Sequence, residues 1–238
     1  MRLPSPSRPP LRPALAGALL LLIPLTAAPL VHAQAEAQTP ASNSSPEAMA
    51  DSWFGDGVAL FFAGKAKESV EAFDQAIKLQ PKIAPQLWQR GLAQYYAEDY
   101  AGGRKQFELH QTVNPNDVEN AAWHFICVAK KDGAEAARKV LIPIEGDTRV
   151  PMKQVHDLFA GKGSEEEVLK AAAKGEKGSE ALRNQLCYAH LYLGLYEEAL
   201  GNVDKAKAHM VKAATEYKMD HYMGKVAQVH VKLRSWGQ

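Results

Sequence analysis

The side chains most able to do chemistry in this chain are its eight histidines and two cysteines. A metal or hydrolytic site needs such groups to converge, yet there is no HExxH motif, no CxxC motif and no histidine pair four residues apart. The nearest groupings are His209 with His221, and His124 with Cys127. Two ligands are too few for a metal ion. The sequence therefore predicts no metal and no cofactor.

Motifs of the common enzyme classes are also missing from the sequence. There is no GxSxG motif, no P-loop and no dinucleotide fingerprint. The stretch GKGS at 161–164 lacks the glycine spacing of a phosphate loop, and we interpret it as a turn between two helices. We expect a protein without catalytic activity, and a hydrolase assembled from scattered residues such as His124 and His156 is kept as an alternative.

Aromatic side chains are the remaining group that could recognise a ligand. The stretch LWQRGLAQYYAEDY, residues 87–100, places Trp88, Tyr95 and Tyr96 around Gly91 in a predicted helix. Glycine inside a helix costs roughly 1 kcal/mol relative to alanine. Close packing of another helix against Gly91 would offset that cost, so the aromatic cluster can serve binding, packing or both.

An internal repeat positions these aromatics. Gly57 recurs as Gly91, Phe73 as Phe107 and Pro81 as Pro115, and the offset along the chain is the same for all three pairs. Three coincidences at one offset indicate a repeated unit. Each unit is predicted to form two amphipathic helices, at 52–63, 66–79, 85–97 and 101–112. Proline ends the second helix of each pair because it cannot donate the backbone hydrogen bond.

This pattern resembles the tetratricopeptide repeat. The positions that carry the resemblance are Trp53, Gly57, Gly64, Phe73, Ala76 and Pro81 in the first unit, Gly91, Phe107 and Pro115 in the second, and Leu193, Gly194, Gly201, Ala206 and Ala213 in a third unit near the C-terminus. In the second unit His110 replaces the expected small residue. The resemblance covers about residues 50–234. It implies an all-α, right-handed helical-repeat solenoid.

Between the second unit and the C-terminal unit the repeat is degenerate. Residues 117–142 are predicted to form a helix pair broken at Asp132 and Gly133, and 152–174 a short hairpin with Ser164 and Glu167 spaced as a capping box. Ser179 is a predicted cap for the helix that follows. The expected units are about 51–83, 84–116, 117–142, 152–174 and 180–217, within a domain at 51–238. A C-terminal capping helix is expected at 221–234.

The N-terminus has the order of a signal peptide. Three arginines precede the apolar run ALAGALLLLIPLTAAPLV, and small residues follow it. We expect cleavage after Ala33, a flexible linker at 34–50 and an exported protein, periplasmic or secreted, without stable membrane insertion; an uncleaved anchor is the alternative. Loss of the three arginines lowers the basic total from 28 to 25, against 27 acidic residues. That balance gives no electrostatic reason to bind nucleic acid.

Cys127 and Cys187 could form a disulfide after export. Both lie in predicted helices that are far apart in the sequence, where buried free thiols are the usual alternative. We expect two free, packed thiols.

The resemblance implies a concave face lined by the first helix of each pair, which in repeat proteins binds a peptide or a partner helix. Seven side chains are expected to line this face, and we call them the aromatic groove: Phe54, Phe61, Phe62, Trp88, Tyr95, Tyr96 and Trp123. Tyr95 and Tyr96 are about 100° apart on a helix, so one is expected in the core and the other in the groove. Family members that clamp a C-terminal carboxylate carry lysine and asparagine at positions that here hold Phe54, Val58, Trp88 and Leu92, so no such clamp is expected.

The expected function is a protein interaction scaffold. The chain is also similar to the bacterial cell-envelope lipoproteins built from tetratricopeptide repeats, which recruit a periplasmic protease and murein hydrolases, although it lacks a lipid-bearing cysteine near the predicted cut. That similarity implies an envelope protease or a cell-wall enzyme as partner. The alternative is a self-associating structural protein that uses the aromatic groove as a homodimer interface.

Overall fold

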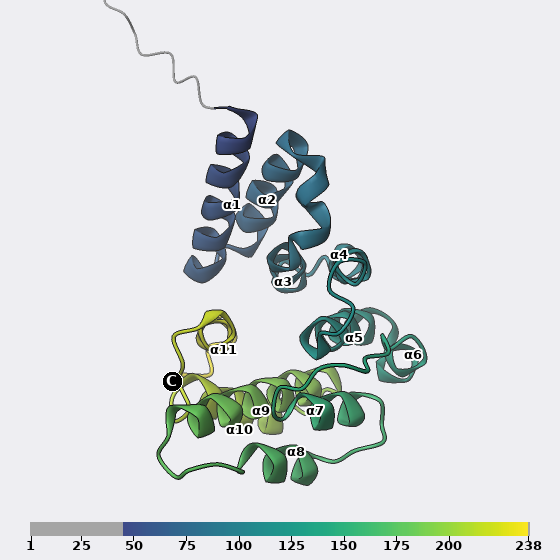
Figure 1. Ribbon diagram of the computed structural model, residues 1–238, viewed down its shortest axis with the longest axis vertical. Coiled ribbons are helices and arrows are strands. Elements are labelled where there is room, and N and C mark those ends of the chain that lie inside the picture. Colours follow the sequence, from purple (N-terminus) through teal and green to yellow (C-terminus); the bar gives the residue numbers. More distant parts are fainter. Residues whose placement is uncertain (1–44, 238) are drawn as a thin grey trace, which may run out of the picture. The chain divides into compact units, whose positions relative to one another are not determined.

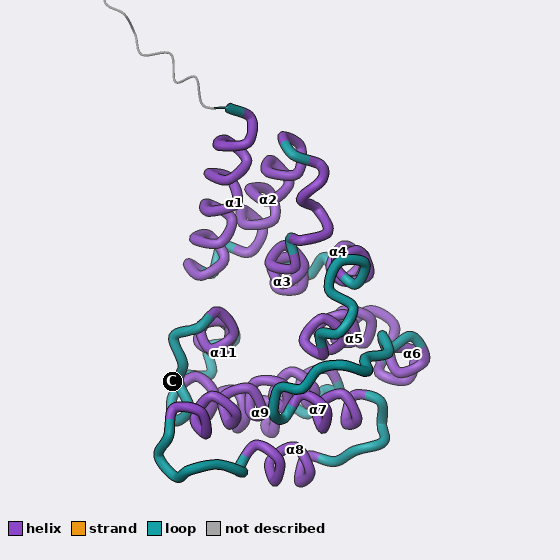
Figure 2. The backbone as a smooth tube through the Cα atoms, viewed as in Figure 1, coloured by secondary structure: helices purple, strands orange, loops and turns teal. Residues whose placement is uncertain are grey.

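The computed structural model describes residues 45–237, and this part of the chain is entirely helical (Figure 1). Within it there are α-helices α1 to α11 and one 3-10 helix, η1, and no strand (Figure 2). The predicted signal peptide at 1–33 and residues 34–44 of the predicted linker lie outside the described residues. None of the helices at 45–237 is long and apolar enough to cross a membrane.

The first two predicted helix pairs are present. Their elements are α1 (Pro46–Ala63), α2 (Ala66–Leu79), η1 (Pro81–Gln86), α3 (Trp88–Tyr96) and α4 (Tyr100–His110). The helices pack against each other within each pair, and α2 also packs on α3. Gly64 ends α1 in the left-handed conformation, with φ of 85°, which glycine adopts without the cost that a Cβ would bring.

Two helix starts in these pairs differ by more than one residue from the sequence prediction. Helix α1 begins at Pro46, inside the predicted linker, because the side chain of Ser45 accepts a hydrogen bond from Ala48 N and caps the first turn. Helix α3 begins at Trp88 rather than at residue 85, because Pro81–Gln86 forms the 3-10 helix η1 between the two pairs.

The repeated glycines lie where paired helices touch. A Cβ built on Gly57 would lie 2.8 Å from the ring of Phe73, and one built on Gly91 would lie 2.6 Å from the ring of Phe107. A Cβ on Gly194 would meet Met210 at 3.0 Å. The spacing between the glycine and the bulky residue is the same in all three cases. The predicted close approach of helices at Gly91 is confirmed.

The middle of the chain forms α5 (Val118–Asp132), α6 (Ala134–Lys139), α7 (Met152–Phe159) and α8 (Glu165–Ala172). The break at Gly133 is confirmed, and so is the capping box, in which Ser164 and Glu167 exchange side-chain and backbone hydrogen bonds. Residues 140–149, between α6 and α7, contain no helix (Figure 2). Helix α5 packs on α4, α6, α7 and α9, which places it at the centre of the described unit.

The C-terminal part forms α9 (Glu180–Ala199), α10 (Val203–Ala214) and α11 (Tyr222–Leu233), and Ser179 caps α9 as predicted. Helices α9 and α10 pack as a pair. Helix α11 packs on α9 and α10 and also on α1, so it lies between the first and the last helix pairs (Figure 1). Its position as the last helix is as predicted, but it is not simply an end cap.

Both cysteines are free and buried, as predicted. Cys127 lies on α5 and its Sγ would be 2.8 Å from a Cβ built on Gly103. Burial raises the pKa of the Cys187 thiol to about 11 and that of Cys127 further. Both are therefore uncharged packing groups at neutral pH.

We predict that Gly91→Ala lowers the free energy of unfolding by about 1 to 3 kcal/mol, because the new methyl group overlaps the ring of Phe107. Gly55 in α1 is the matched control, since a Cβ there would meet nothing within 4 Å. Gly55→Ala should raise the free energy of unfolding by up to about 1 kcal/mol through helix propensity. Urea unfolding followed by circular dichroism measures both. Equal stabilisation by the two substitutions would show that no close approach exists at Gly91.

Candidate functional site

The aromatic groove is largely closed in the structure. Phe61, Tyr95, Tyr96 and Trp123 are buried, and the other three members, Phe54, Phe62 and Trp88, are partly buried. The expectation that all seven line a partly open concave face is therefore wrong for the four buried residues, and neither tyrosine of the pair is exposed in a groove.

Helix α11 is the reason for this closure. The ring of Tyr222 is nearly parallel to that of Phe61, with centroids 6.4 Å apart, and it contacts the rings of Phe62 and Trp88 at 4.7 Å. Most of the buried side chains of α11 are apolar, among them Met223, Val226, Ala227 and Val231. The chain thus covers most of its own aromatic groove.

A buried polar network fixes α11 in place. The Tyr95 hydroxyl donates to Glu198 Oε2 at 3.2 Å and Arg234 Nε donates to Glu198 Oε1 at 2.7 Å. His230 on α11 lies between Tyr96, whose hydroxyl is 2.9 Å from Nδ1, and Glu198, whose Oε2 is 3.3 Å from Nε2. Burial acts to raise the pKa of Glu198, but the nearby positive groups outweigh it and hold that pKa below its usual value. Burial lowers the pKa of His230 to about 4.

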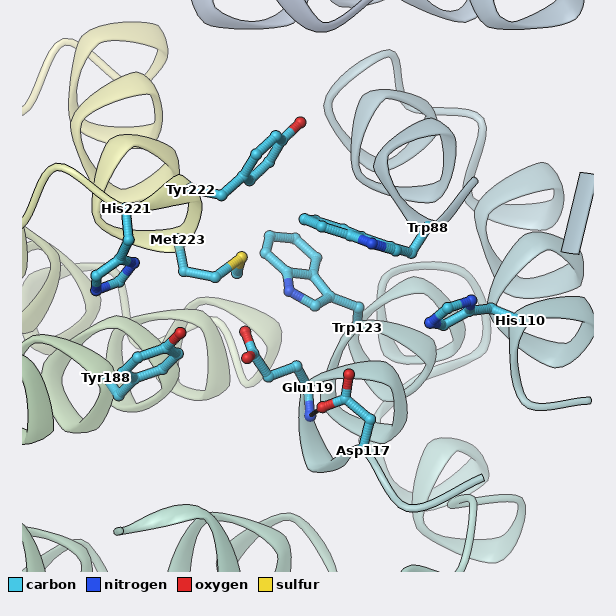
Figure 3. A pocket seen from close by; sticks show the side chains of 9 residues that line it. All are labelled: Trp88, His110, Asp117, Glu119, Trp123, Tyr188, His221, Tyr222 and Met223. Carbon is cyan, nitrogen blue, oxygen red and sulfur yellow. Dashed lines mark hydrogen bonds between the residues drawn. The ribbon is translucent and has the colours of Figure 1, made fainter. Parts of the chain in front are cut away.

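Where α11 meets α3 and α5, a pocket of about 240 Å³ remains (Figure 3). We call it the Trp123 pocket. Its wall residues are Trp88, His110, Asp117, Glu119, Trp123, Tyr188, His221, Tyr222 and Met223. They come from α3, α4, the start of α5, α9 and the start of α11. Two predicted groove residues, Trp88 and Trp123, line this pocket, and the other five do not.

Helix termini place the polar wall of the pocket. Asp117 caps α5 by accepting a hydrogen bond from Glu119 N at 3.0 Å, and Asn114 Nδ2 donates to its other oxygen. His221 caps α11, because its Nδ1 accepts a hydrogen bond from Gly224 N at 3.2 Å. Since Nδ1 is an acceptor, neutral His221 carries its proton on Nε2. Burial lowers the pKa of His221, which favours this neutral form.

An acidic cluster forms beneath the pocket around Arg149. The guanidinium pairs with Asp147 at 2.6 Å, with Asp117 at 2.5 Å and with Glu119 through Nη1. Asp147 also accepts a hydrogen bond from Val118 N at 3.1 Å, at the start of α5, where the helix dipole favours negative charge. Three carboxylates therefore share one guanidinium, and the cluster has an excess of negative charge.

Glu119 is the member of this cluster that also lines the pocket. Its side chain is 13% exposed, and its Oε2 accepts a 2.6 Å hydrogen bond from Tyr192. Burial and then the charge of Asp117 raise the pKa of Glu119 to about 7, against the opposing effect of Arg149. In Figure 3 its carboxylate points into the space bounded by Trp123, Met223 and Tyr188.

Three polar atoms on the pocket wall have no hydrogen-bond partner among the described residues: Trp123 Nε1, His221 Nε2 and Tyr222 OH. Trp123 is only 2% exposed, and its Nε1 edge is turned toward the same space as the Glu119 carboxylate (Figure 3). A buried polar group without a partner costs about 1 to 3 kcal/mol. The indole offers its N–H donor to whatever enters the pocket, whereas His221 Nε2 lies at the edge of its ring that faces away from Trp123 and Glu119 (Figure 3).

The arrangement can bind a ligand through ring faces, a carboxylate and an N–H donor. Across residues 45–237, no group of three His, Cys, Asp or Glu side chains is placed to hold a metal ion. The two histidines considered for hydrolysis have structural partners: His156 Nε2 donates to Ile142 O at 2.9 Å, and His124 Nε2 is 3.4 Å from Glu108 Oε1. No protein-family model matches the chain.

Sequence reasoning missed Glu119, Tyr188, His221 and Tyr222. A signal for α11 was present, because Met223, Val226, Ala227, His230 and Val231 recur at the spacing of one broad helical face, which predicts a buried helix. No comparable sequence pattern indicates that Glu119 lines a pocket. Its pairing with Arg149 joins distant parts of the sequence and becomes visible only in the folded chain.

We predict that Glu119→Gln changes how stability depends on pH. Between pH 5 and 7 the folded chain holds a proton on Glu119 that the unfolded chain has released, so this group makes stability fall as pH rises. Relative to the wild type, the variant should gain stability across this window by at most about 1.4 kcal/mol per pH unit. The lowered pKa values of His190 and His230 affect both proteins equally, so their contributions cancel when the stability of the wild type is subtracted from that of the variant. Urea unfolding of both proteins at pH 5, 6, 7 and 8 measures the difference in their free energies of unfolding. A difference that stays constant with pH would contradict the raised pKa of Glu119.

Proposed function

We propose that this chain is an exported, non-catalytic helical-repeat protein of the tetratricopeptide type that binds a segment of another protein in the Trp123 pocket. The observation that carries the proposal is the set of unpaired polar atoms on an aromatic wall. Trp123 Nε1, His221 Nε2 and Tyr222 OH have no partners elsewhere in the described chain, and the three residues all line one pocket. An arriving main-chain carbonyl would accept from the Trp123 N–H, which faces the space beside Glu119 (Figure 3).

Support for the repeat architecture comes from the helix pairs. The pairs α1–α2, α3–α4 and α9–α10 each bring a glycine against a bulky side chain that follows it at the same spacing. Three pairs with the same contact are what a right-handed solenoid of repeated hairpins would require. Export rests on the sequence of residues 1–33 alone, and an envelope protease or cell-wall enzyme as partner rests on family resemblance alone.

The size of the pocket favours recognition of one side chain with its flanking backbone. At about 240 Å³ it is smaller than the roughly 300 to 1,000 Å³ of pockets that enclose drug-sized ligands. Trp88, Tyr188 and Tyr222 are partly exposed at its rim. Amphipathic rings at the edge and a buried donor inside are typical of sites that anchor a single residue of a partner.

We predict that the purified protein enriches specific sequences from a displayed library of short random peptides, and that Trp88→Ala weakens their binding by about tenfold or more. Loss of the Trp88 ring removes one wall of the pocket, and truncation of such an aromatic anchor costs roughly 2 kcal/mol or more at typical interfaces. Titration of a labelled peptide by fluorescence anisotropy measures the effect.

Trp53→Ala is the control, because Trp53 is an exposed tryptophan on α1 that does not line the pocket. It should leave binding unchanged. A library that yields no enriched sequence, or peptides that lose affinity with Trp53→Ala and not with Trp88→Ala, would overturn the proposal.

A further inference from the structure

We infer that the Trp123 pocket selects a positively charged side chain, arginine or lysine, from the bound peptide. This inference rests on the proposed function and names the residue that the partner must present. It is carried by three features that meet in one place: three carboxylates that share a single guanidinium, a wall of aromatic rings, and the buried N–H donor of Trp123, which has no partner in the described chain.

The charge balance excludes an anionic group as the preferred occupant. Asp117 and Glu119 line the pocket, Asp147 stands behind them, and Arg149 is the one guanidinium they share. No lysine or arginine is among the wall residues. A carboxylate or phosphate would therefore enter against net negative charge at short range, whereas a cation would lower the repulsion between Asp117 and Glu119.

The carboxylates have unequal roles, and this leaves Glu119 for the ligand. Asp117 and Asp147 accept hydrogen bonds from Glu119 N and Val118 N, so both are used to begin α5. Glu119 caps nothing. Its oxygens receive one hydrogen bond each, from Arg149 and Tyr192. A carboxylate oxygen can accept a second hydrogen bond, so a donor entering the pocket can bind Glu119 while its present contacts stay in place.

The aromatic wall suits the same occupant. Trp88, Trp123, Tyr188 and Tyr222 border the pocket, and ring faces attract a cation placed within about 6 Å of their centroids, tryptophan most strongly. The rings of Tyr222 and Trp88 contact each other with an interplanar angle of 70° and centroids 4.7 Å apart. The ring of Tyr188 is stacked on that of His221, with centroids 5.1 Å apart. These contacts fix the rings before a ligand arrives, which lowers the entropy cost of binding.

The unpaired donor shows that the occupant carries more than a cation. Trp123 Nε1 is buried and unpaired within the described chain, and it is turned toward the same space as the Glu119 carboxylate (Figure 3). It needs an acceptor, which a bare ammonium ion does not offer. A basic residue within a peptide supplies both parts, because its side chain is cationic and its main-chain carbonyl accepts. A free amino acid or a small amine lacks the flanking backbone, so a peptide residue is the occupant to which we commit.

The test is a double-mutant cycle on peptides enriched from the random library, measured at pH 8 where Glu119 is ionised. Enriched peptides should contain arginine or lysine. Replacement of that residue by its neutral counterpart, citrulline for arginine or acetyl-lysine for lysine, should weaken binding to the wild type by roughly 10- to 100-fold. With Glu119→Gln the same replacement should have little further effect, because the charge partner is already gone.

Two controls keep the result interpretable. Glutamine at 119 can still accept the hydrogen bond from Tyr192, and Arg149 keeps Asp117 and Asp147, so the variant should fold; circular dichroism checks this. Glu135→Gln is the matched substitution, since it also removes a carboxylate paired with an arginine, on α6 and outside the pocket. It should leave peptide binding unchanged. With the wild type, binding should weaken when the NaCl concentration is raised about tenfold, as expected for a charge-assisted contact near solvent.

The outcomes separate this inference from the proposed function. The inference would be overturned by enriched peptides that lack basic residues. It would also be overturned if the effects on affinity of the peptide replacement and of Glu119→Gln were additive. In either case, binding that depends on Trp88 would still support the proposed function. Peptide binding whose affinity changes neither with the salt concentration nor with Glu119→Gln would also overturn the inference and leave the proposed function standing. A library that yields no enriched peptide would overturn both.

Discussion

The carboxylate of Glu198 is the constraint on which the site depends. It is buried on α9 and is reached by Tyr95 from α3 and by Arg234 from the end of α11, with His230 at 3.3 Å. A buried carboxylate is costly unless charge and hydrogen bonds compensate it, and removing one partner of such a group typically costs about 3 to 5 kcal/mol. Displacing α11 would remove both Arg234 and His230. The polar network therefore gives α11 one position, whereas apolar packing alone would tolerate several.

That position of α11 creates the Trp123 pocket. Its acidic wall and its two tryptophans come from α3 and α5 in the first half of the described chain. Tyr188 comes from α9, and His221, Tyr222 and Met223 come from the start of α11. The rest of α11 fills the space that a ligand would take in an open groove. The part of the inner face that stays open is thus a recess between Trp88 and Tyr188. The helix pairs supply most of its walls, and the last helix determines which part of them stays accessible.

The parts of the fold that could be predicted from the sequence are those determined by local chemistry. The constant repeat offset, the glycine at each close approach, the capping box at Ser164 and the break at Gly133 each depend on neighbours within one helix pair. The aromatic groove failed as a prediction because exposure is a tertiary property. The repeat register places Phe61 and Tyr96 on an inner face, but only the packing of α11 decides whether that face meets water. Glu119 could not be found for a related reason: its environment is assembled by Arg149, Tyr192 and α11, which are distant in sequence.

The start of α5 shows how the capping of a central helix leaves a carboxylate in the wall of a pocket. Helix α5 lies at the centre of the unit and buries nearly all of its length, so its first turn needs strong capping. Asp117 and Asp147 provide it, and Arg149 is required to keep two carboxylates together. Once that arrangement exists, a glutamate in the same first turn is drawn toward Arg149 but adds a third negative charge that Arg149 cannot balance alone. Its side chain then faces aromatic rings and the unpaired N–H of Trp123. A charge left incompletely compensated inside a preformed pocket costs stability, and binding of a complementary charge is the event that would relieve that cost.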